Sequence, residues 1–219
     1  MRQKEINNMK ISKAVKASFL LFFFLGISSA YVKAFTIAGP SMTPTYWYDD
    51  IVVSNHLAYD FRLPHTDLVL LETGQPERGD LIIYFDIPKN SVAAKRIIGI
   101  PGDTVSIKDN VIYLNGEEIS QSIEPKRYFD NVPDKNGIGE IVLSEEIDGT
   151  SHLITYTPGA GQINSIEPIK VTEGKYFILG DNRDNSGDSR FIGLISRGQI
   201  KGKVIHGYRP LESYAPPSA

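Results

Sequence analysis

The chain has 219 residues, 41% of them hydrophobic, which is enough for one substantial core and a smaller second lobe. It contains no cysteine, which excludes disulfide bonds, thiolate metal sites and a cysteine nucleophile. The formal net charge of -3 argues against a nucleic-acid partner, because proteins that bind nucleic acids usually carry a basic surface.

The N-terminal region has the pattern of a membrane-targeting segment. Five lysine and arginine residues and one acidic residue precede the apolar run ASFLLFFFLGISSAYV. As a helix, this run of 16 residues would extend about 24 Å, and flanking lysines could complete the span by snorkelling. We therefore expect a basic cytosolic segment over residues 1–16 and a transmembrane anchor over residues 17–35, with the rest of the chain outside the cytosol. A cleaved signal peptide is the alternative, since Ser28 and Ala30 form a small-x-small site.

The remainder of the chain has the pattern of short β-strands separated by turns. Runs of β-branched and aromatic residues after a turn predict strands at residues 50–53, 80–85, 103–107, 151–157 and 175–179. Asn115-Gly116 predicts a hairpin within residues 110–119. Residues 120–149 are polar and rich in turn residues, so we expect an irregular excursion or small lobe there. Residues 211–219 are expected to form a flexible tail.

Ser41 is a candidate nucleophile in the turn GPSMTP. Pro40 and Pro44 restrict the backbone on both sides of it, and Gly39 leaves room for a substrate chain. The backbone N–H of Ser41 could also stabilise a developing oxyanion. A serine in such a turn more commonly caps the backbone or faces solvent, and that reading stays open from this turn alone.

Lys95 is the candidate base for this serine, on the predicted strand SVAAKRIIGI. The period of two places Lys95 on the same face as Ala93 and Ile97, among small and apolar neighbours. A lysine has a pKa of about 10.4 in water, and burial can lower it by the two to three units that a base near neutral pH needs. The alternative is an exposed lysine on an edge strand.

The segment GDNRDNSGDSR, residues 180–190, is dense in Asp and Asn and superficially resembles a calcium loop. The spacing does not fit, because counting from Asn182 places Gly193 where the loop needs a bidentate glutamate. We expect no metal there. We expect instead a tight polar turn in which carboxylates pair with arginines, the members being Asp181, Asp188, Arg96, Arg183 and Arg190. The four histidines lie in no recognisable triad or metal motif.

Four segments occur in the order found in bacterial type I signal peptidases: SMTPT (41–45), RGDLIIYF (78–85), KRIIGIPGD (95–103) and GDNRDNSGDSR (180–190). The chain resembles this family, in particular its Gram-negative type, over about residues 37–208. The resemblance implies a membrane-bound serine endopeptidase that uses no cofactor and removes signal peptides from exported preproteins.

The resemblance also implies roles for individual residues. Ser41 would be the nucleophile, Lys95 the general base, and Ser186 a hydrogen-bond partner of that lysine. The supporting residues around them would be Asp181, Asp188, Arg96 and Arg190. Some family members carry a serine at the position of Gly39 that helps the oxyanion hole, so only backbone donation is expected here.

The implied fold is mainly β: a curved antiparallel catalytic lobe, preceded by one N-terminal transmembrane helix. We expect the lobe to comprise residues 36–104 and 173–210, with a small β-rich insertion lobe over residues 105–172. The family accepts small side chains at positions -1 and -3 of a substrate that binds as an added strand. Candidates for lining those shallow pockets are Ile37, Met42 and Ala94. The aromatic residues 46–48 are expected at the lipid interface.

The leading functional hypothesis is general preprotein processing by a monomer in the bacterial inner membrane, with the catalytic lobe on the periplasmic face. A second is a dedicated peptidase of conjugative transfer that processes one pilin or transfer protein. A third is a catalytically silent, membrane-anchored β protein that binds extended peptides.

Overall fold

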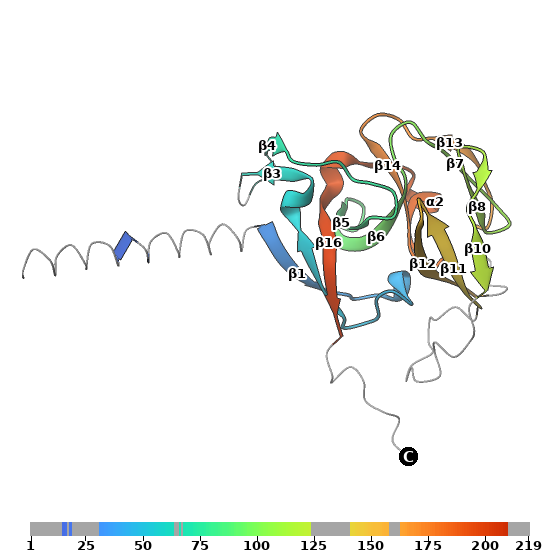
Figure 1. The fold of residues 1–219 in the computed structure, drawn as a ribbon, viewed down its shortest axis with the longest axis horizontal. Helices are drawn as coiled ribbons and strands as arrows, with labels where there is room; N and C mark the ends of the chain where they lie inside the picture. Colours follow the sequence, from blue (N-terminus) through green and yellow to red (C-terminus); the bar gives the residue numbers. More distant parts are fainter. Residues whose placement is uncertain are drawn as a thin grey trace, which may run out of the picture.

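The structure is a computed structural model, and the residues it describes are 15, 16, 18, 31–63, 66, 68–123, 141–157 and 163–209. Antiparallel strands make up most of this part of the chain, in sheets of seven, four, three and two strands (Figure 1). The predicted mainly antiparallel β class is confirmed. Helical structure in the body is short: η1 (Pro40–Met42), η2 (His56–Ala58), α2 (Ser189–Ile192) and η4 (Arg197–Gln199).

The seven-stranded sheet positions the four motif segments relative to one another. Its order is β1 (Val32–Thr36), β2 (Ile51–Asn55), β16 (Ile200–Tyr208), β5 (Leu81–Asp86), β6 (Ser91–Gly99), β14 (Lys175–Leu179) and β15 (Ile195–Ser196). Strand β6, which carries Lys95, lies between β5 and β14. Because β14 leads directly into residues 180–190, the lysine motif and the final motif are adjacent.

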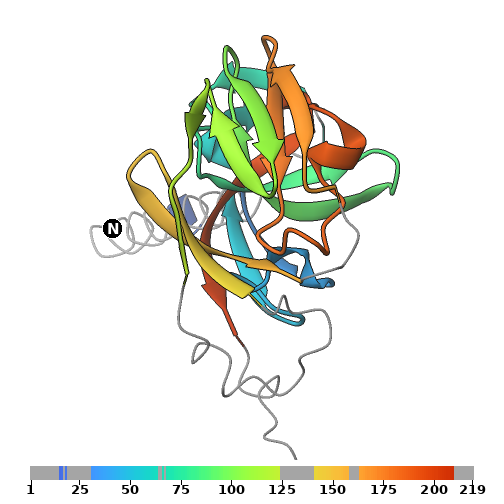
Figure 2. The ribbon, with the colours of Figure 1, turned by 90° about the vertical axis from the view of Figure 1, so that its right-hand side faces the viewer.

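Three smaller sheets complete the fold. The four-stranded sheet has the order β13 (Ile166–Lys170), β7 (Thr104–Lys108), β8 (Val111–Leu114) and β9 (Glu117–Glu118). The three-stranded sheet consists of β10 (Gln121–Ile123), β11 (Ile141–Ile147) and β12 (Thr150–Tyr156), and the two-stranded one of β3 (Asp60–Arg62) and β4 (Val69–Glu72). Figure 2 shows the hairpin of β11 and β12 in yellow, near the green strands of the four-stranded sheet.

The five strands predicted as runs of residues and the hairpin at Asn115-Gly116 are all present. The prediction of an irregular segment over residues 120–149 is wrong for its last part. Residues 141–147 form β11, which pairs along its whole length with β12.

Among the described residues, the expected insertion and the catalytic lobe share one buried cluster. One buried cluster joins Ile98 of β6 and Phe177 of β14 to Val105 of β7, Ile112 of β8 and Ile147 of β11. Burial of apolar surface is the main favourable term in folding, so this shared cluster couples the stability of the two lobes. The boundaries predicted from the sequence therefore divide one continuous core.

The expected anchor lies mostly outside the described residues, and its end at residue 35 needs correction. Val32–Thr36 form β1, which pairs with β2 from Val32 opposite Asn55 to Thr36 opposite Ile51. No helix among the described residues has the length and apolar character to span a membrane. The expected tail, residues 211–219, and His65 also lie outside the described residues.

Candidate active site

The turn that carries Ser41 forms the helix η1, after Gly39 in an extended conformation. Two hydrogen bonds close it on the carbonyl of Pro40, from the Thr43 backbone N–H at 3.0 Å and from Thr43 Oγ1 at 2.8 Å. Met42 is 1% exposed and anchors the turn in a small apolar cluster. The backbone that carries the Ser41 hydroxyl is therefore held in place by hydrogen bonds and by apolar packing.

The side chain of Lys95 lies within hydrogen-bonding distance of Ser41. Its Nζ donates to Ser41 Oγ at 2.7 Å and to the Ala94 carbonyl at 2.9 Å. Lys95 is 3% exposed on an interior strand, so the alternative of an exposed lysine on an edge strand is wrong. Burial lowers the pKa of Lys95 to about 8, and the positive charge of Lys89 adds to this while Asp188 and Asp181 oppose it. A neutral amine is therefore accessible at mildly alkaline pH.

Two buried arginine–carboxylate pairs lie near Ser41 and Lys95, and the final motif supplies both carboxylates and Arg190. Arg96 Nε and Nη2 donate to Asp181 at 2.9 and 2.7 Å. Arg190 Nε and Nη2 donate to Asp188 at 2.8 and 2.9 Å. Asp188 Oδ2 also accepts the N–H of Gly180 at 3.0 Å. Bidentate pairs of this kind fix orientation as well as charge, so both carboxylates brace the loop.

Arg183 and Ser186 depart from what the sequence suggested. Arg183 pairs with Glu145 of β11, not with Asp181 or Asp188. The expected hydrogen bond from Ser186 to Lys95 is absent, and Ser186 Oγ has no hydrogen-bond partner among the described residues. This hydroxyl packs closely against Gly180, where an added Cβ would lie 2.2 Å from it.

Asn182 is a site residue that the sequence analysis did not single out. Its backbone N–H donates to the Ser41 carbonyl at 3.1 Å. Its Nδ2 donates to the Pro40 carbonyl at 3.2 Å and to Thr43 Oγ1 at 2.9 Å. The final motif therefore contacts the Ser41 turn directly, and the only signal for this in the sequence is the motif's Asp/Asn density.

A cleft of about 430 Å³ opens beside the dyad. Its lining includes Ser41, Lys95 and all three residues proposed for the substrate pockets, Ile37, Met42 and Ala94. These three side chains are buried, so the floor beside Ser41 is apolar. The lining also includes the polar side chains of Lys89 and Asn185.

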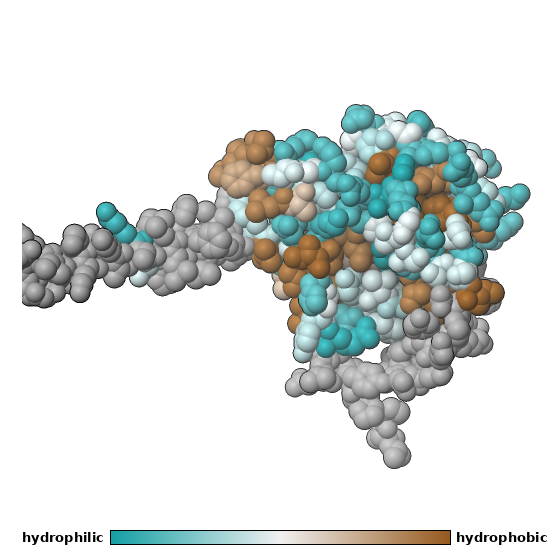
Figure 3. Space-filling view, in the orientation of Figure 1, coloured by the Kyte–Doolittle hydropathy of each residue, from teal (hydrophilic) through white to brown (hydrophobic). Residues whose placement is uncertain are grey.

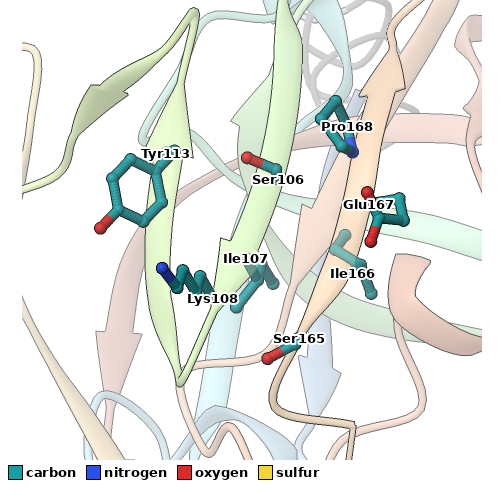
Figure 4. Close-up of a pocket in the computed structure, with 8 residues that line it drawn as sticks. All are labelled: Ser106, Ile107, Lys108, Tyr113, Ser165, Ile166, Glu167 and Pro168. Atoms are coloured by element: carbon teal, nitrogen blue, oxygen red, sulfur yellow. The ribbon is translucent and has the colours of Figure 1, made fainter.

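A second hollow, of about 580 Å³, lies on the four-stranded sheet and shares no lining residue with the cleft. Figure 4 shows Lys108, Tyr113 and Glu167 around it, none of which belongs to the four motifs. Among the described residues, no group of three His, Asp or Glu side chains could hold a metal ion.

The family model of signal peptidase, peptidase S26, matches residues 11–208. The chain belongs to this family. The resemblance carried by the four motifs is confirmed, and the activity is that of a signal peptidase, a serine endopeptidase that cleaves signal peptides from preproteins.

Two relatives show how far the similarity to signal peptidases extends. Signal peptidase I of Pseudomonas aeruginosa is 34% identical over 200 residues, which cover 85% of this chain and 68% of that protein. Signal peptidase IB of Staphylococcus aureus is 34% identical over 212 residues, covering 97% of this chain and 94% of that protein. Since both share the same identity with this chain, the Gram-negative type stays a prediction.

A solved structure of a signal peptidase I from Enterococcus faecalis is 30% identical in sequence. It covers 60% of this chain and 97% of its own, with a TM-score of 0.36.

Proposed function

We propose that Ser41 is the nucleophile and Lys95 the general base of signal-peptide cleavage. The observation that supports this most directly is the 2.7 Å hydrogen bond between Ser41 Oγ and the buried Lys95 Nζ. The neutral amine accepts the hydroxyl proton as Oγ attacks the scissile carbonyl carbon. The resulting ammonium then donates a proton to the leaving amine, which leaves an acyl-enzyme on Ser41. A water molecule that gives its proton to Lys95 would hydrolyse this ester.

The oxyanion of the tetrahedral intermediate needs hydrogen-bond donors. The backbone N–H of Ser41 is the candidate donor in this chain. Gly39 has no side chain to add a second, and an ideal Cβ at that position would meet no atom within 4 Å. The open space beside Gly39 leaves the approach to the nucleophile unobstructed.

We propose that the substrate lies extended in the cleft, with the small side chains at -1 and -3 against its apolar floor. Ile37 and Ala94 line the cleft from two different segments, the residues after β1 and strand β6. A peptide added as a strand between them would place alternate side chains toward the floor. Met42 is 1% exposed and forms part of the same floor.

We propose a single-pass protein of the bacterial inner membrane, a monomer whose catalytic lobe faces the periplasm. The exposed apolar side chains of the β3–β4 hairpin support the proposal that the protein contacts lipid. It and its turn expose apolar side chains at Phe61, Leu63, Leu68, Val69, Leu70 and Leu71. Figure 3 shows hydrophobic atoms gathered on this part of the surface. Tyr31 ties the N-terminal side of the fold to the same hairpin, with its ring 5.5 Å from that of Phe61.

The aromatic residues 46–48 are poorer candidates for lipid contact than expected. Tyr46 packs closely against Gly207, and the Trp47 indole N–H donates to the Pro44 carbonyl at 3.1 Å. Only Tyr48, which is 52% exposed, is free to meet a lipid headgroup region. The hairpin therefore replaces the 46–48 segment as the proposed lipid-contacting element.

The decisive experiment is incubation of the detergent-solubilised full chain with a preprotein, beside Ser41→Ala and Lys95→Ala. The parent should release the mature protein, and each variant should lose at least about 10³-fold in rate, as expected when a nucleophile or its base is removed. Ser106→Ala and Lys108→Ala are matched controls, because they remove a serine and a lysine from the other hollow. Equal cleavage by all the proteins, or none by the parent, would remove the assignment.

The same assay separates the enzyme from a silent peptide-binding protein, which would bind the preprotein without cleaving it. Depletion of the protein in cells addresses the dedicated conjugative-transfer alternative. General processing predicts that many preproteins accumulate, whereas a dedicated peptidase predicts that a single pilin or transfer protein does.

A further inference from the structure

A buried ion pair joins the insertion to the final motif. Glu145 on β11 is 0% exposed and Arg183 is 1% exposed. Arg183 Nη1 donates to Glu145 Oε2 at 3.0 Å, and Nη2 donates to Oε1. Burial alone would raise the pKa of Glu145, but the adjacent charge of Arg183 lowers it far below its usual range. The charged form of the pair is therefore favoured.

The position of the Glu145–Arg183 ion pair indicates a role besides stabilising the fold. Removing two charges from water is costly, and an apolar pair of similar size is often as stable. Arg183, however, does more than neutralise Glu145. Its Nε donates to the Gly180 carbonyl at 3.2 Å, and its Nη1 lies 3.3 Å from Tyr156 Oη. Its guanidinium thus connects both strands of the β11–β12 hairpin to the start of the final motif.

The same loop segment holds the nucleophile. The Asn182 N–H donates to the Ser41 carbonyl at 3.1 Å. At Gly180, an added Cβ would lie 2.4 Å from that carbonyl oxygen, so the two backbones are in close contact. On the other side, Thr155 of β12 donates to the Asp181 carbonyl at 2.8 Å and accepts from the Arg183 N–H at 2.9 Å. Residues 180–183 therefore lie between the β11–β12 hairpin and the Ser41 turn.

We propose that Glu145 is a positioning residue for catalysis: through Arg183 it holds residues 180–183 where they keep Ser41 Oγ within reach of Lys95. This assigns the insertion lobe a role in the reaction, namely to fix one wall of the active site. The inference rests on the proposed Ser41–Lys95 dyad. Its chemical basis is that proton transfer depends steeply on donor–acceptor geometry, so a small displacement of the Ser41 turn lowers the rate of acylation.

Glu145→Gln tests the proposal in the full chain, because it keeps the shape of the side chain and removes its charge. Glu146→Gln is the matched control, since Glu146 is the next residue of the same strand and is exposed. We expect kcat for preprotein cleavage to fall by about tenfold to a hundredfold in Glu145→Gln, since a misplacement of about 1 Å can cost 10²-fold. KM should be unchanged, because the cleft floor is not altered. Unchanged kcat in a folded Glu145→Gln would overturn the proposal.

A second readout is hydrogen exchange of the backbone amides of residues 180–183 relative to those of residues 96–98, followed by mass spectrometry. Glu145→Gln should speed exchange in the first segment selectively, because it loosens the loop and not the sheet. Equal acceleration in both segments would reveal a purely structural role and overturn the proposal. This measurement does not depend on cleavage, so it separates a failure of the positioning proposal from a failure of the dyad assignment.

Tyr156→Phe is the second variant for this test, and it is used if Glu145→Gln does not fold. It removes only the hydroxyl that contacts Arg183 Nη1 and Asn110, and leaves the ion pair in place. The same two effects are expected with smaller size: a fall in kcat of a few-fold and faster exchange in residues 180–183. A folded Tyr156→Phe with parental kcat and parental exchange would count against the coupling.

Discussion

The guanidinium of Arg96 lies against the carboxylate of Asp181 through two parallel hydrogen bonds, at 2.9 and 2.7 Å, and both residues are buried. Arg96 directly follows Lys95 on β6, so this pair fixes the final motif beside Lys95. Burial by itself would raise the pKa of Asp181, but the charge and hydrogen bonds of Arg96 lower it overall. The pair should therefore stabilise the fold at neutral pH and lose its effect in acid.

The first prediction concerns stability in acid. A carboxyl whose pKa is lowered in the folded protein contributes stability above its unfolded pKa, about 3.9 for Asp, and loses it as pH falls further. The free energy of unfolding by urea should thus fall steeply below about pH 4. Asp181→Asn should be less stable at pH 7, by about 3–5 kcal/mol for a broken buried pair, and less sensitive to acid. Parallel pH curves for parent and variant would contradict this account.

The second prediction concerns the pH dependence of cleavage. Because burial, helped by Lys89, lowers the pKa of Lys95 to about 8, kcat/KM should rise with pH and level off above that value. Lys89→Ala removes a positive neighbour, favours the protonated amine, and should move the midpoint upward by less than about one unit. The Lys89 side chain is 65% exposed, so salt should shrink the difference. Lys108→Ala is the control, and an identical shift in it would point to a nonspecific charge effect.

The third prediction tests the contact between the final motif and the nucleophile turn. Gly180→Ala would place a Cβ 2.4 Å from the Ser41 carbonyl oxygen and 2.2 Å from Ser186 Oγ. Overpacking of this kind costs about 1–3 kcal/mol and should displace the turn, so both thermal stability and kcat should fall. Gly198→Ala is the matched control, because its Cβ would meet nothing within 4 Å. Parental kcat in Gly180→Ala would show that the turn tolerates displacement.

The fourth prediction uses the open space at Gly39. Gly39→Ser would add a hydroxyl beside the nucleophile without a clash, since no atom lies within 4 Å of the added Cβ. If the oxyanion depends on backbone donation alone, kcat should rise several-fold, whereas Gly39→Ala should leave it unchanged. Equal kcat values for the two variants would argue that the hydroxyl does not reach the oxyanion.

The fifth prediction concerns the lipid-contacting hairpin. Because the chain lacks cysteine, Leu70→Cys creates a unique site for an environment-sensitive fluorophore. In proteoliposomes this label should be shielded from a water-soluble quencher. Ile123→Cys is the control, since Ile123 is 82% exposed on the insertion lobe. Equal quenching at both positions would exclude the hairpin as the lipid-contacting element.

Much of the site could be anticipated from local patterns. The alternation around Lys95 placed it among small and apolar neighbours but left an exposed edge-strand lysine open, and the charges of the final motif indicated arginine–carboxylate pairs. The partner of Arg183 could not be found in this way, because Glu145 lies 38 residues earlier in a polar segment without a motif. The orientation of Ser186 was equally inaccessible, since it depends on tight packing against Gly180.

The missed strand β11 did leave a signal in the sequence. Asp148 and Gly149, both with positive φ, form the turn between β11 and β12. Asp-Gly is as strong a hairpin indicator as the Asn-Gly pair at residues 115 and 116, which was recognised. Strand β11 was missed because its sequence is polar, with the charged residue Glu145 at a core-facing position.

The place of β16 in the middle of the large sheet has a consequence for biosynthesis. This strand, near the C-terminal end of the described residues, pairs with β2 on one side and β5 on the other. The two halves of that sheet cannot join until the ribosome has released residue 208. A nascent chain that lacks β16 therefore has an incomplete large sheet, and we expect it to have no peptidase activity.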